Sequence, residues 1–291
     1  MFKGSIVALL TPFRNGRVDE KAFQALCEWQ IAEGTHGLVP CGTTGETPTL
    51  SHEEHKRVID LCVEVAGKRV PVIAGTGSNN TLEAVELSAY ARKAGVDAVL
   101  IQMPYYNRPT QEGLYAHCKA IHDAVDIPIV LYNVPSRSAV DLSQDTLVKL
   151  GKLPRIVGIK DATGNIARIS ATRLMLGSKF AQLSGEDATA LAVLAHGGHG
   201  CISVTANVAP RLCAEMQTAW FAGKPQDCLD IQDRLMPLHT ALFLETNPSP
   251  VKYAASLLDL CTDEVRLPLV GLKPETKEKV RTAMIAAGLL N

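Results

Sequence analysis

The sequence of 291 residues lacks the features that mark several classes of protein. It has no run of like charge, and its 29 Lys and Arg against 30 Asp and Glu give a formal net charge of -1. This balance argues against a nucleic-acid or membrane-surface partner. No apolar stretch approaches the roughly 20 residues of a membrane span, and the apolar start is interrupted at Thr11 and Pro12, too early for a signal peptide. We therefore expect a cytoplasmic protein.

Two further absences concern cysteine and metal chemistry. None of the eight cysteines forms a C-x-x-C pair, and most lie within apolar patterns, so we expect free thiols in a reducing compartment. The tightest histidine pair, His196 and His199 in "AHGGHG", has no carboxylate or cysteine beside it to complete a metal site. The sequence therefore predicts neither a disulfide framework nor a bound metal.

What the sequence does contain is a regular alternation of strand and helix patterns. Eight short apolar segments are each followed by a helical pattern: "SIVALL", "GLVPCG", "PVIAGT", "AVLIQMP", "IPIVLYNVP", "RIVGIKDA", "FAQLSG" and "GCISV". Continuous apolar strands that alternate with amphipathic helices indicate a parallel sheet, and eight such units fit a (β/α)8 barrel. An open doubly wound sheet is the alternative. We expect the barrel over residues 1–224 and a helical C-terminal region over 225–291, where the strand pattern stops.

Barrels of this kind carry their chemistry on the loops that follow the carboxyl ends of the strands. The candidate residues at or directly after the ends of the predicted strands are Thr43, Thr44, Glu46, Tyr105, Tyr106, Tyr132, Arg137, Lys160 and Gly185. "AHGGHG" instead precedes a strand and is better explained as a helix end and a tight turn. "GTGSN" follows a strand but lacks the spacing of a nucleotide-binding loop.

Lys160 ends the apolar strand "RIVGIK". A lone lysine there most often extends its ammonium group into water. It can also act as a nucleophile, because desolvation at an apolar strand end favours the neutral amine that forms a Schiff base. Such chemistry needs a proton shuttle, and Tyr132 at the end of the preceding strand is a candidate.

The remaining polar residues on these loops each have two interpretations. Arg137 in "VPSR" is either a solvated loop charge or a bidentate ligand for a carboxylate. "CGTTGE" is either a turn before a helix or a set of N–H and hydroxyl groups that holds a small carboxylate. Ser51 and Glu54 have the spacing of a capping box, and His52 and His55 then share one face of the helix that follows.

Seven motifs together resemble the dihydrodipicolinate synthase family: "GTTGE", "PYYNRPTQEGLY", "YNVPSR", "GIKDATGN", "LSGEDA", "GHGCISVTANVAP" and "RLMPLH". The resemblance runs over nearly the whole chain. "GxTGE" alone marks the wider superfamily of pyruvate-dependent aldolases, whereas the double threonine and Arg137 point to the synthases. Asp161 stands where glutamate is usual, and Glu186 stands where aspartate is common.

The resemblance implies a condensation of pyruvate with L-aspartate 4-semialdehyde in lysine biosynthesis, without a cofactor. It assigns the Schiff base to Lys160, acid–base catalysis to Tyr132, and a proton relay to Thr43 and to Tyr106, which enters from a neighbouring subunit. Substrate contacts fall to Thr44, Arg137, Gly185 and Ile202. The implied assembly is a homotetramer, a dimer of dimers.

The resemblance also implies a site for L-lysine as an inhibitor, formed by Thr47, His52, His55, Asn79, Glu83 and Tyr105. A polar interface without a ligand is the alternative, and Pro48 departs from the small residue often found at its position. Two other functions stay open: an aldolase of the same superfamily that acts on a sugar acid and does not need Arg137, and a metabolite-binding barrel without catalysis.

Overall fold

The computed structural model describes residues 2–291. Its contacts divide the chain into two compact units. The first comprises Pro71–Ile202 with residues 2 and 3, and the second comprises Gly4–Val70 and Ser203–Asn291. The predicted division into a barrel over residues 1–224 and a helical region over 225–291 stays a prediction.

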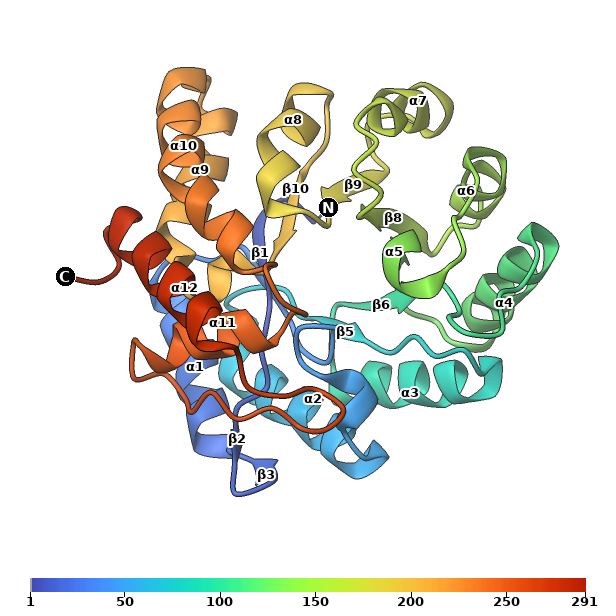
Figure 1. Cartoon of the computed structure of the whole chain (residues 1–291). Helices are drawn as coiled ribbons and strands as arrows, with labels where there is room; N and C mark the ends of the chain where they lie inside the picture. Colours follow the sequence, from blue (N-terminus) through green and yellow to red (C-terminus); the bar gives the residue numbers. More distant parts are fainter. Residues whose placement is uncertain (1) are drawn as a thin grey trace. The chain divides into compact units, whose positions relative to one another are not determined.

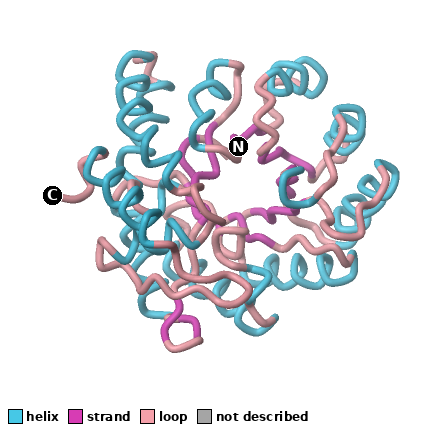
Figure 2. The backbone as a smooth tube through the Cα atoms, viewed as in Figure 1, coloured by secondary structure: helices cyan, strands magenta, loops and turns pink. Residues whose placement is uncertain are grey.

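The first unit is a run of parallel strands and helices. Its strands are β5 (Ile73–Gly75), β6 (Ala98–Gln102), β7 (Ile129–Asn133), β8 (Ile156–Asp161), β9 (Ala181–Ser184) and β10 (Gly200–Ser203), and each is hydrogen-bonded to the next in this order. Its helices are α3 (Thr81–Ala94), α4 (Gln111–Ala124), the short α5 (Pro135–Ser138), α6 (Gln144–Gly151), α7 (Ala167–Leu176) and α8 (Ala190–Ala195). Within this unit the longer helices lie along one side of the row of strands (Figures 1 and 2).

The second unit joins the beginning of the chain to its end. Strands β1 (Gly4–Ala8) and β4 (Gly37–Val39) pair in parallel, and β2 (Phe13–Arg14) and β3 (Arg17–Val18) form a small antiparallel hairpin. The helices are α1 (Glu20–Ala32), α2 (His52–Ala66), α9 (Pro210–Phe221), α10 (Pro225–Ala241), α11 (Ser249–Ser256) and α12 (Pro274–Ala286). The C-terminal region packs within this unit, because α10 contacts α9 and α12.

The eight strand–helix pairs lie where the sequence predicts them, because local signals set their limits. Ser51 caps α2 and forms a capping box with Glu54, as its spacing indicated. Gly67 and Gly95 end α2 and α3 in the left-handed conformation that glycine adopts readily. The β2–β3 hairpin and α5 were not predicted, since each is too short to show a periodic pattern.

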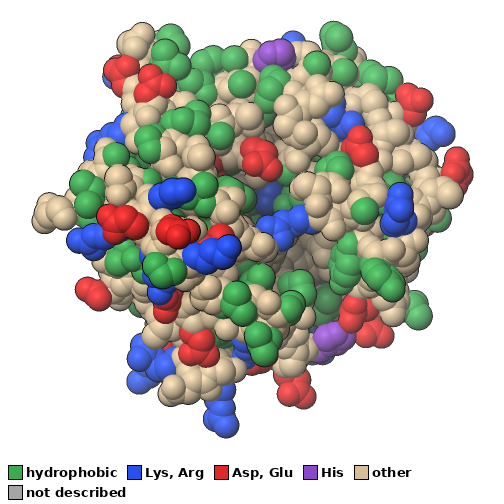
Figure 3. All heavy atoms as spheres, in the orientation of Figure 1, with side chains coloured by type: hydrophobic (Ala, Val, Ile, Leu, Met, Phe, Trp, Pro, Cys, Tyr) green, Lys and Arg blue, Asp and Glu red, His purple; other side chains and the backbone are tan. Residues whose placement is uncertain are grey.

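Apolar side chains of the strands make the core, and the cysteines belong to it. Seven of the eight thiols are buried, and Cys261 is half-buried; all eight are free. Burial raises the pKa of Cys118 to about 12. Acidic and basic side chains are interspersed over the face drawn in Figure 3, in keeping with the balanced charge. No helix within residues 2–291 is long and apolar enough to span a membrane.

Candidate active site

Lys160 and Tyr132 are neighbours at the ends of two adjacent strands. They pair across β7 and β8, and the Lys160 Nζ atom lies 4.2 Å from the centroid of the Tyr132 ring. Lys160 is only 6% exposed, which argues against the alternative that its ammonium group extends into water. A buried amine beside a phenol has the two groups that imine chemistry requires, a nucleophile and a proton carrier.

Gly185 follows β9, and Ile202 lies on β10. Gly185 comes directly after β9, and its backbone N–H donates to the Asp161 carbonyl at 2.7 Å. A Cβ atom at Gly185 would lie 2.6 Å from the Cβ of Ala162, so only glycine permits this close approach. Ile202 is fully buried in β10. Any side chain at position 185 would therefore push apart the segments that follow β8 and β9.

Glu186, which the sequence marks only as a departure from the family pattern, lies near the charges of Lys160 and Arg137. Burial, followed by repulsion from Asp187, raises the pKa of its carboxyl group. Lys160 and Arg137 both act on the carboxyl in the opposite direction, so Glu186 lies within electrostatic range of both cations. Its position directly after Gly185, at a strand end, was the signal that could have found it.

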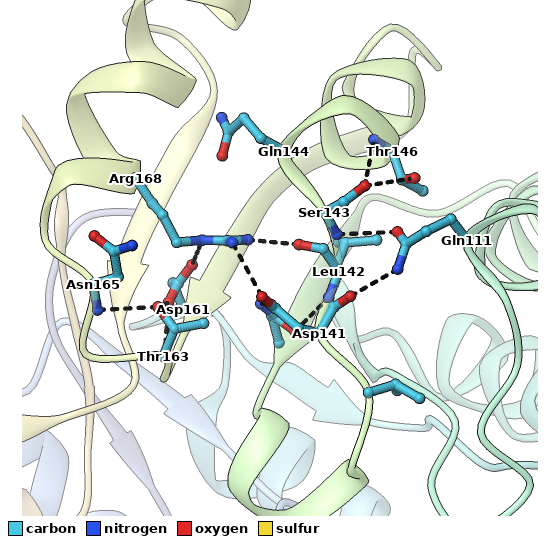
Figure 4. Close-up of polar contacts among 12 residues, drawn as sticks. Gln111, Asp141, Leu142, Ser143, Gln144, Thr146, Asp161, Thr163, Asn165 and Arg168 are labelled. Atoms are coloured by element: carbon cyan, nitrogen blue, oxygen red, sulfur yellow. Dashed lines mark hydrogen bonds and ion pairs between the residues drawn. The ribbon is translucent and has the colours of Figure 1, made fainter.

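Arg168 on α7 joins the end of β8 to the segment that follows α5 (Figure 4). Its Nε donates to Asp161 at 3.1 Å and its Nη2 donates to the Leu142 carbonyl at 2.6 Å, while Nη1 lies 3.5 Å from Asp141. The buried Asn133, which follows Tyr132, donates to Asp141 at 2.7 Å and accepts from the Leu142 N–H at 3.1 Å. We call these five residues the Arg168 cluster.

The Arg168 cluster includes the residues that follow Tyr132 and Lys160 in the chain. Asn133 pairs with Asp161 in the register that also pairs Tyr132 with Lys160. Successive strand residues point to opposite faces of a sheet, so the cluster holds the strand ends from the face opposite the Lys160 and Tyr132 side chains. Thr163 adds two further donors to Asp161, through its N–H at 2.8 Å and its hydroxyl at 2.6 Å.

The two tyrosines after β6 are exposed. Tyr106 is 91% exposed and adopts a φ of 67°, which is uncommon for a bulky residue. The loop is held by Asn79, whose side chain donates to the Tyr105 carbonyl at 3.3 Å. Burial, and then the charge of Glu83, raises the pKa of Tyr105. Glu83 also accepts a hydrogen bond from the Ser78 hydroxyl.

In the second unit, the "GTTGE" segment forms a tight turn before α2. The Gly45 N–H donates to the Gly42 carbonyl at 3.0 Å, and the Glu46 N–H donates to the Thr43 carbonyl at 3.1 Å. Thr44 is buried and Thr43 is half-buried. The Thr47 hydroxyl donates to the carbonyls of Cys41 and Gly42. The segment is thus a hydrogen-bonded turn that carries two adjacent threonines.

The histidines at the start of α2 differ in exposure. His52 is exposed and His55 is buried, although both are on the first turn of the helix.

His196 and His199 each form a hydrogen-bonding contact with another part of the chain. His196 Nδ1 lies 3.1 Å from the Ser170 hydroxyl, and His199 Nδ1 accepts from the Gln182 N–H at 3.1 Å. Within residues 2–291 no group of three His, Cys, Asp or Glu is arranged to hold a metal ion.

Glu46 is held by a lysine that no local pattern indicated. The Lys252 ammonium on α11 donates to the Glu46 carboxylate, and the two side chains are 0% and 1% exposed. The Lys252 Nζ atom also donates to the Glu264 carbonyl at 2.9 Å and lies 3.8 Å from the centroid of the Phe13 ring. We call this contact the Lys252–Glu46 pair.

Comparison with known proteins identifies the family. The family model described as the dihydrodipicolinate synthetase family matches residues 1–287. The chain belongs to this family. A protein of Rhodospirillum centenum named 4-hydroxy-tetrahydrodipicolinate synthase is 65% identical over 290 residues, and the match covers all of both chains.

Solved structures of the family confirm the fold. The chloride-inhibited dihydrodipicolinate synthase of Acinetobacter baumannii, complexed with pyruvate, matches with a TM-score of 0.97 and 48% identity over 100% of both chains. The enzyme of Cyanidioschyzon merolae with lysine bound matches with a TM-score of 0.96 and 37% identity over 99% of both. The chain therefore has the expected (β/α)8 barrel fold followed by C-terminal helices, and the open doubly wound sheet is wrong.

Proposed function

We propose that the chain catalyses the 4-hydroxy-tetrahydrodipicolinate synthase reaction, an EC 4.3.3.7 lyase reaction, in the cytoplasm. The observation that carries the proposal is the buried Lys160 beside Tyr132 at the ends of β7 and β8. The names of the relatives and the pyruvate bound to the Acinetobacter baumannii enzyme support it. The reaction joins pyruvate to L-aspartate 4-semialdehyde and feeds lysine biosynthesis.

The chemistry proceeds through a Schiff base. The neutral Lys160 amine attacks the keto carbon of pyruvate, and water leaves as the imine forms. The protonated imine accepts the electron pair when a methyl proton leaves, which gives an enamine. The enamine carbon then forms a bond to the aldehyde carbon of the semialdehyde. The amine of the new chain displaces the Lys160 amine as the ring closes, which regenerates the enzyme.

The remaining residues bind the substrates and move protons. Tyr132 exchanges protons with the reacting atoms, with Thr43 and Tyr106 as its relay. Thr44 holds the pyruvate carboxylate, and the Gly185 and Ile202 backbones line the site near Lys160. Arg137, which is exposed on α5, binds the semialdehyde carboxylate.

Borohydride trapping tests the Schiff base. Pyruvate followed by borohydride should leave a reduced three-carbon adduct on Lys160, located by mass mapping of the peptide around "IVGIKDATGN". Lys160→Arg retains a cation and should give no adduct. An adduct on another lysine, or none on the wild-type chain, would overturn the mechanism.

Arg137 tests the identity of the second substrate. Arg137→Ala should raise the semialdehyde KM on the order of 10- to 100-fold, the equivalent of about 1.5–3 kcal/mol for a hydrogen-bonded charge, with little change in pyruvate trapping. Arg108→Ala removes an exposed cation after β6 and serves as control. Equal loss for both substrates would contradict the role. No loss for either would also contradict it and would favour the sugar-acid aldolase, which does not need Arg137.

We propose that Tyr106 serves the site of a neighbouring subunit in a homotetramer built as a dimer of dimers. Its 91% exposure in an isolated chain supports this assignment. Hybrids of Tyr106→Phe and Lys160→Ala chains should regain activity, because one hybrid site keeps both residues. Verified hybrids without activity would show that Tyr106 acts within its own chain.

We also propose feedback inhibition by L-lysine through Thr47, His52, His55, Asn79, Glu83 and Tyr105. The lysine-bound Cyanidioschyzon merolae enzyme supports it. A lysine titration of the initial rate should show inhibition at millimolar concentrations or below, and Glu83→Gln should weaken it. A flat wild-type titration would refute the regulation, and an unchanged variant would refute the site.

A further inference from the structure

The C-terminal region reaches the substrate-binding turn at a second point besides the Lys252–Glu46 pair. Asn247, in the loop between α10 and α11, places its side-chain Nδ2 atom 3.1 Å from the Thr44 hydroxyl oxygen. The contact joins residues 203 positions apart, and both side chains are buried. Neither residue's local sequence pattern indicates this partner.

The direction of this hydrogen bond sets what Thr44 can do. A threonine hydroxyl has one proton to donate and two lone pairs that accept. The Asn247 amide N–H can only donate, so it occupies a lone pair of Thr44. The Thr44 proton therefore points to a different partner, and a carboxylate is an acceptor that uses it.

The turn that carries Thr44 is itself held in place. Glu46 adopts a φ of 53°, a left-handed conformation that is unfavourable for a residue with a side chain. Its carboxylate is fixed by Lys252, by the Arg266 N–H at 3.1 Å and by the Thr49 hydroxyl at 3.4 Å. The Thr11 hydroxyl donates to the Gly45 carbonyl at 2.8 Å. The position of the Thr44 side chain is thus set by the turn, and its hydroxyl direction by Asn247.

We propose that Asn247 is a positioning residue for pyruvate: by donating to Thr44 it turns the Thr44 proton toward the substrate carboxylate. This inference rests on the proposed function, because it needs Thr44 to hold that carboxylate. It adds to the site a residue from the C-terminal region that touches no substrate itself.

Two substitutions test the direction of the hydrogen bond. Asn247→Ala removes the donor and should raise the pyruvate KM about 3- to 10-fold, because a neutral hydrogen bond contributes about 0.5–1.5 kcal/mol. Asn247→Asp has nearly the same shape but only accepts, so the Thr44 proton turns away from pyruvate. It should raise the pyruvate KM on the order of 10- to 100-fold, as expected for a lost hydrogen bond to a charge. The semialdehyde KM should change less than 3-fold in both variants.

Matched variants separate positioning from other effects. Gln226→Glu makes the same amide-to-carboxylate change at an exposed site on α10 and should leave the pyruvate KM unchanged. Thr44→Val removes the hydroxyl with little change in shape. If Asn247 acts through that hydroxyl, the Asn247→Ala change should add little to the pyruvate KM of Thr44→Val, whereas independent effects would multiply.

The outcomes are distinct. A wild-type chain without a pyruvate adduct on Lys160 would overturn the proposed function, whatever Asn247 does. A normal wild-type adduct with an unchanged pyruvate KM in Asn247→Asp would overturn the positioning role alone, and so would multiplicative effects in the Thr44→Val background. If Asn247→Ala does not fold, the near-isosteric Asn247→Asp decides, with thermal unfolding as the check that it is native.

Discussion

The Arg168 cluster of the first unit and the Lys252–Glu46 pair of the second differ in their contact with water. In the Arg168 cluster, the Arg168 side chain is 14% exposed and its partner Asp141 is 53% exposed. In the Lys252–Glu46 pair, neither side chain is more than 1% exposed. Water can therefore solvate part of the first group when a partner is lost, whereas it cannot solvate the second. Loss of one charged partner should therefore lower the stability less in the Arg168 cluster than in the Lys252–Glu46 pair.

Breaking the buried pair should have the largest effect. Lys252→Met keeps the aliphatic length but leaves the Glu46 carboxylate buried without its ammonium partner. We expect the free energy of unfolding to fall by about 3–5 kcal/mol, measured by urea denaturation.

The double variant Lys252→Met with Glu46→Gln is the matched control. It removes both charges, so it should recover most of the lost stability, because replacing a whole buried pair is often close to neutral. A loss of less than about 1 kcal/mol in the single variant would show that the unpaired, buried Glu46 carboxylate does not destabilise the fold. A double variant that is no more stable than the single one would show the same.

Breaking the Arg168 cluster should have an intermediate effect on stability and a separate effect on chemistry. Arg168→Gln removes the contacts to Asp161 and Asp141, and we expect a loss of about 1–3 kcal/mol in unfolding free energy. The rate of pyruvate trapping at Lys160 should also fall, because the ends of β7 and β8 are less firmly held.

Arg173→Gln makes the same change at an exposed position of α7 and should cost less than about 0.5 kcal/mol. A trapping rate that is unchanged in stably folded Arg168→Gln would limit the cluster to a structural role. A trapping rate that falls equally in both variants would exclude a specific effect of Arg168.

The smallest effect concerns pH and the half-buried Glu186. The pKa of its carboxyl is raised in the folded state, chiefly by burial, from an ordinary value of 4.5. Its stabilising contribution is therefore complete below pH 4.5 and is lost as the pH rises through the folded-state pKa. Glu186→Gln should gain stability relative to wild type as the pH rises from 4 to 8, measured by urea unfolding at each pH.

Glu112 provides a control of opposite sign. Hydrogen bonds from the backbone and from Thr110 lower the pKa of this carboxyl, so its contribution is present above pH 4.5 and is lost as the pH falls. Glu112→Gln should lose stability relative to wild type as the pH rises. Parallel trends for the two variants would show that net charge, rather than burial of Glu186, controls the response.

The same contrast explains how much was predictable from the sequence. The strands, the helices and the strand-end position of Lys160 follow from local periodicity and capping, which neighbouring residues encode. Arg168 lies seven residues from Asp161 but joins a second segment near Leu142, and no short pattern indicates that. Lys252 was unpredictable for a further reason, because lysines are almost never fully buried unless they are paired, and its partner is 206 positions away.

The turn around Thr44 has a consequence for how the protein is made. Thr44 and Glu46 are synthesised early, whereas Asn247 and Lys252 follow them by 203 and 206 residues. At a synthesis rate of about 5–20 residues per second, the ribosome needs roughly 10–40 s to add that stretch. During this interval the nascent chain carries the Glu46 carboxylate without its ammonium partner and the Thr44 hydroxyl without its orienting amide. The contacts that hold this turn are thus complete only after Lys252 has been translated.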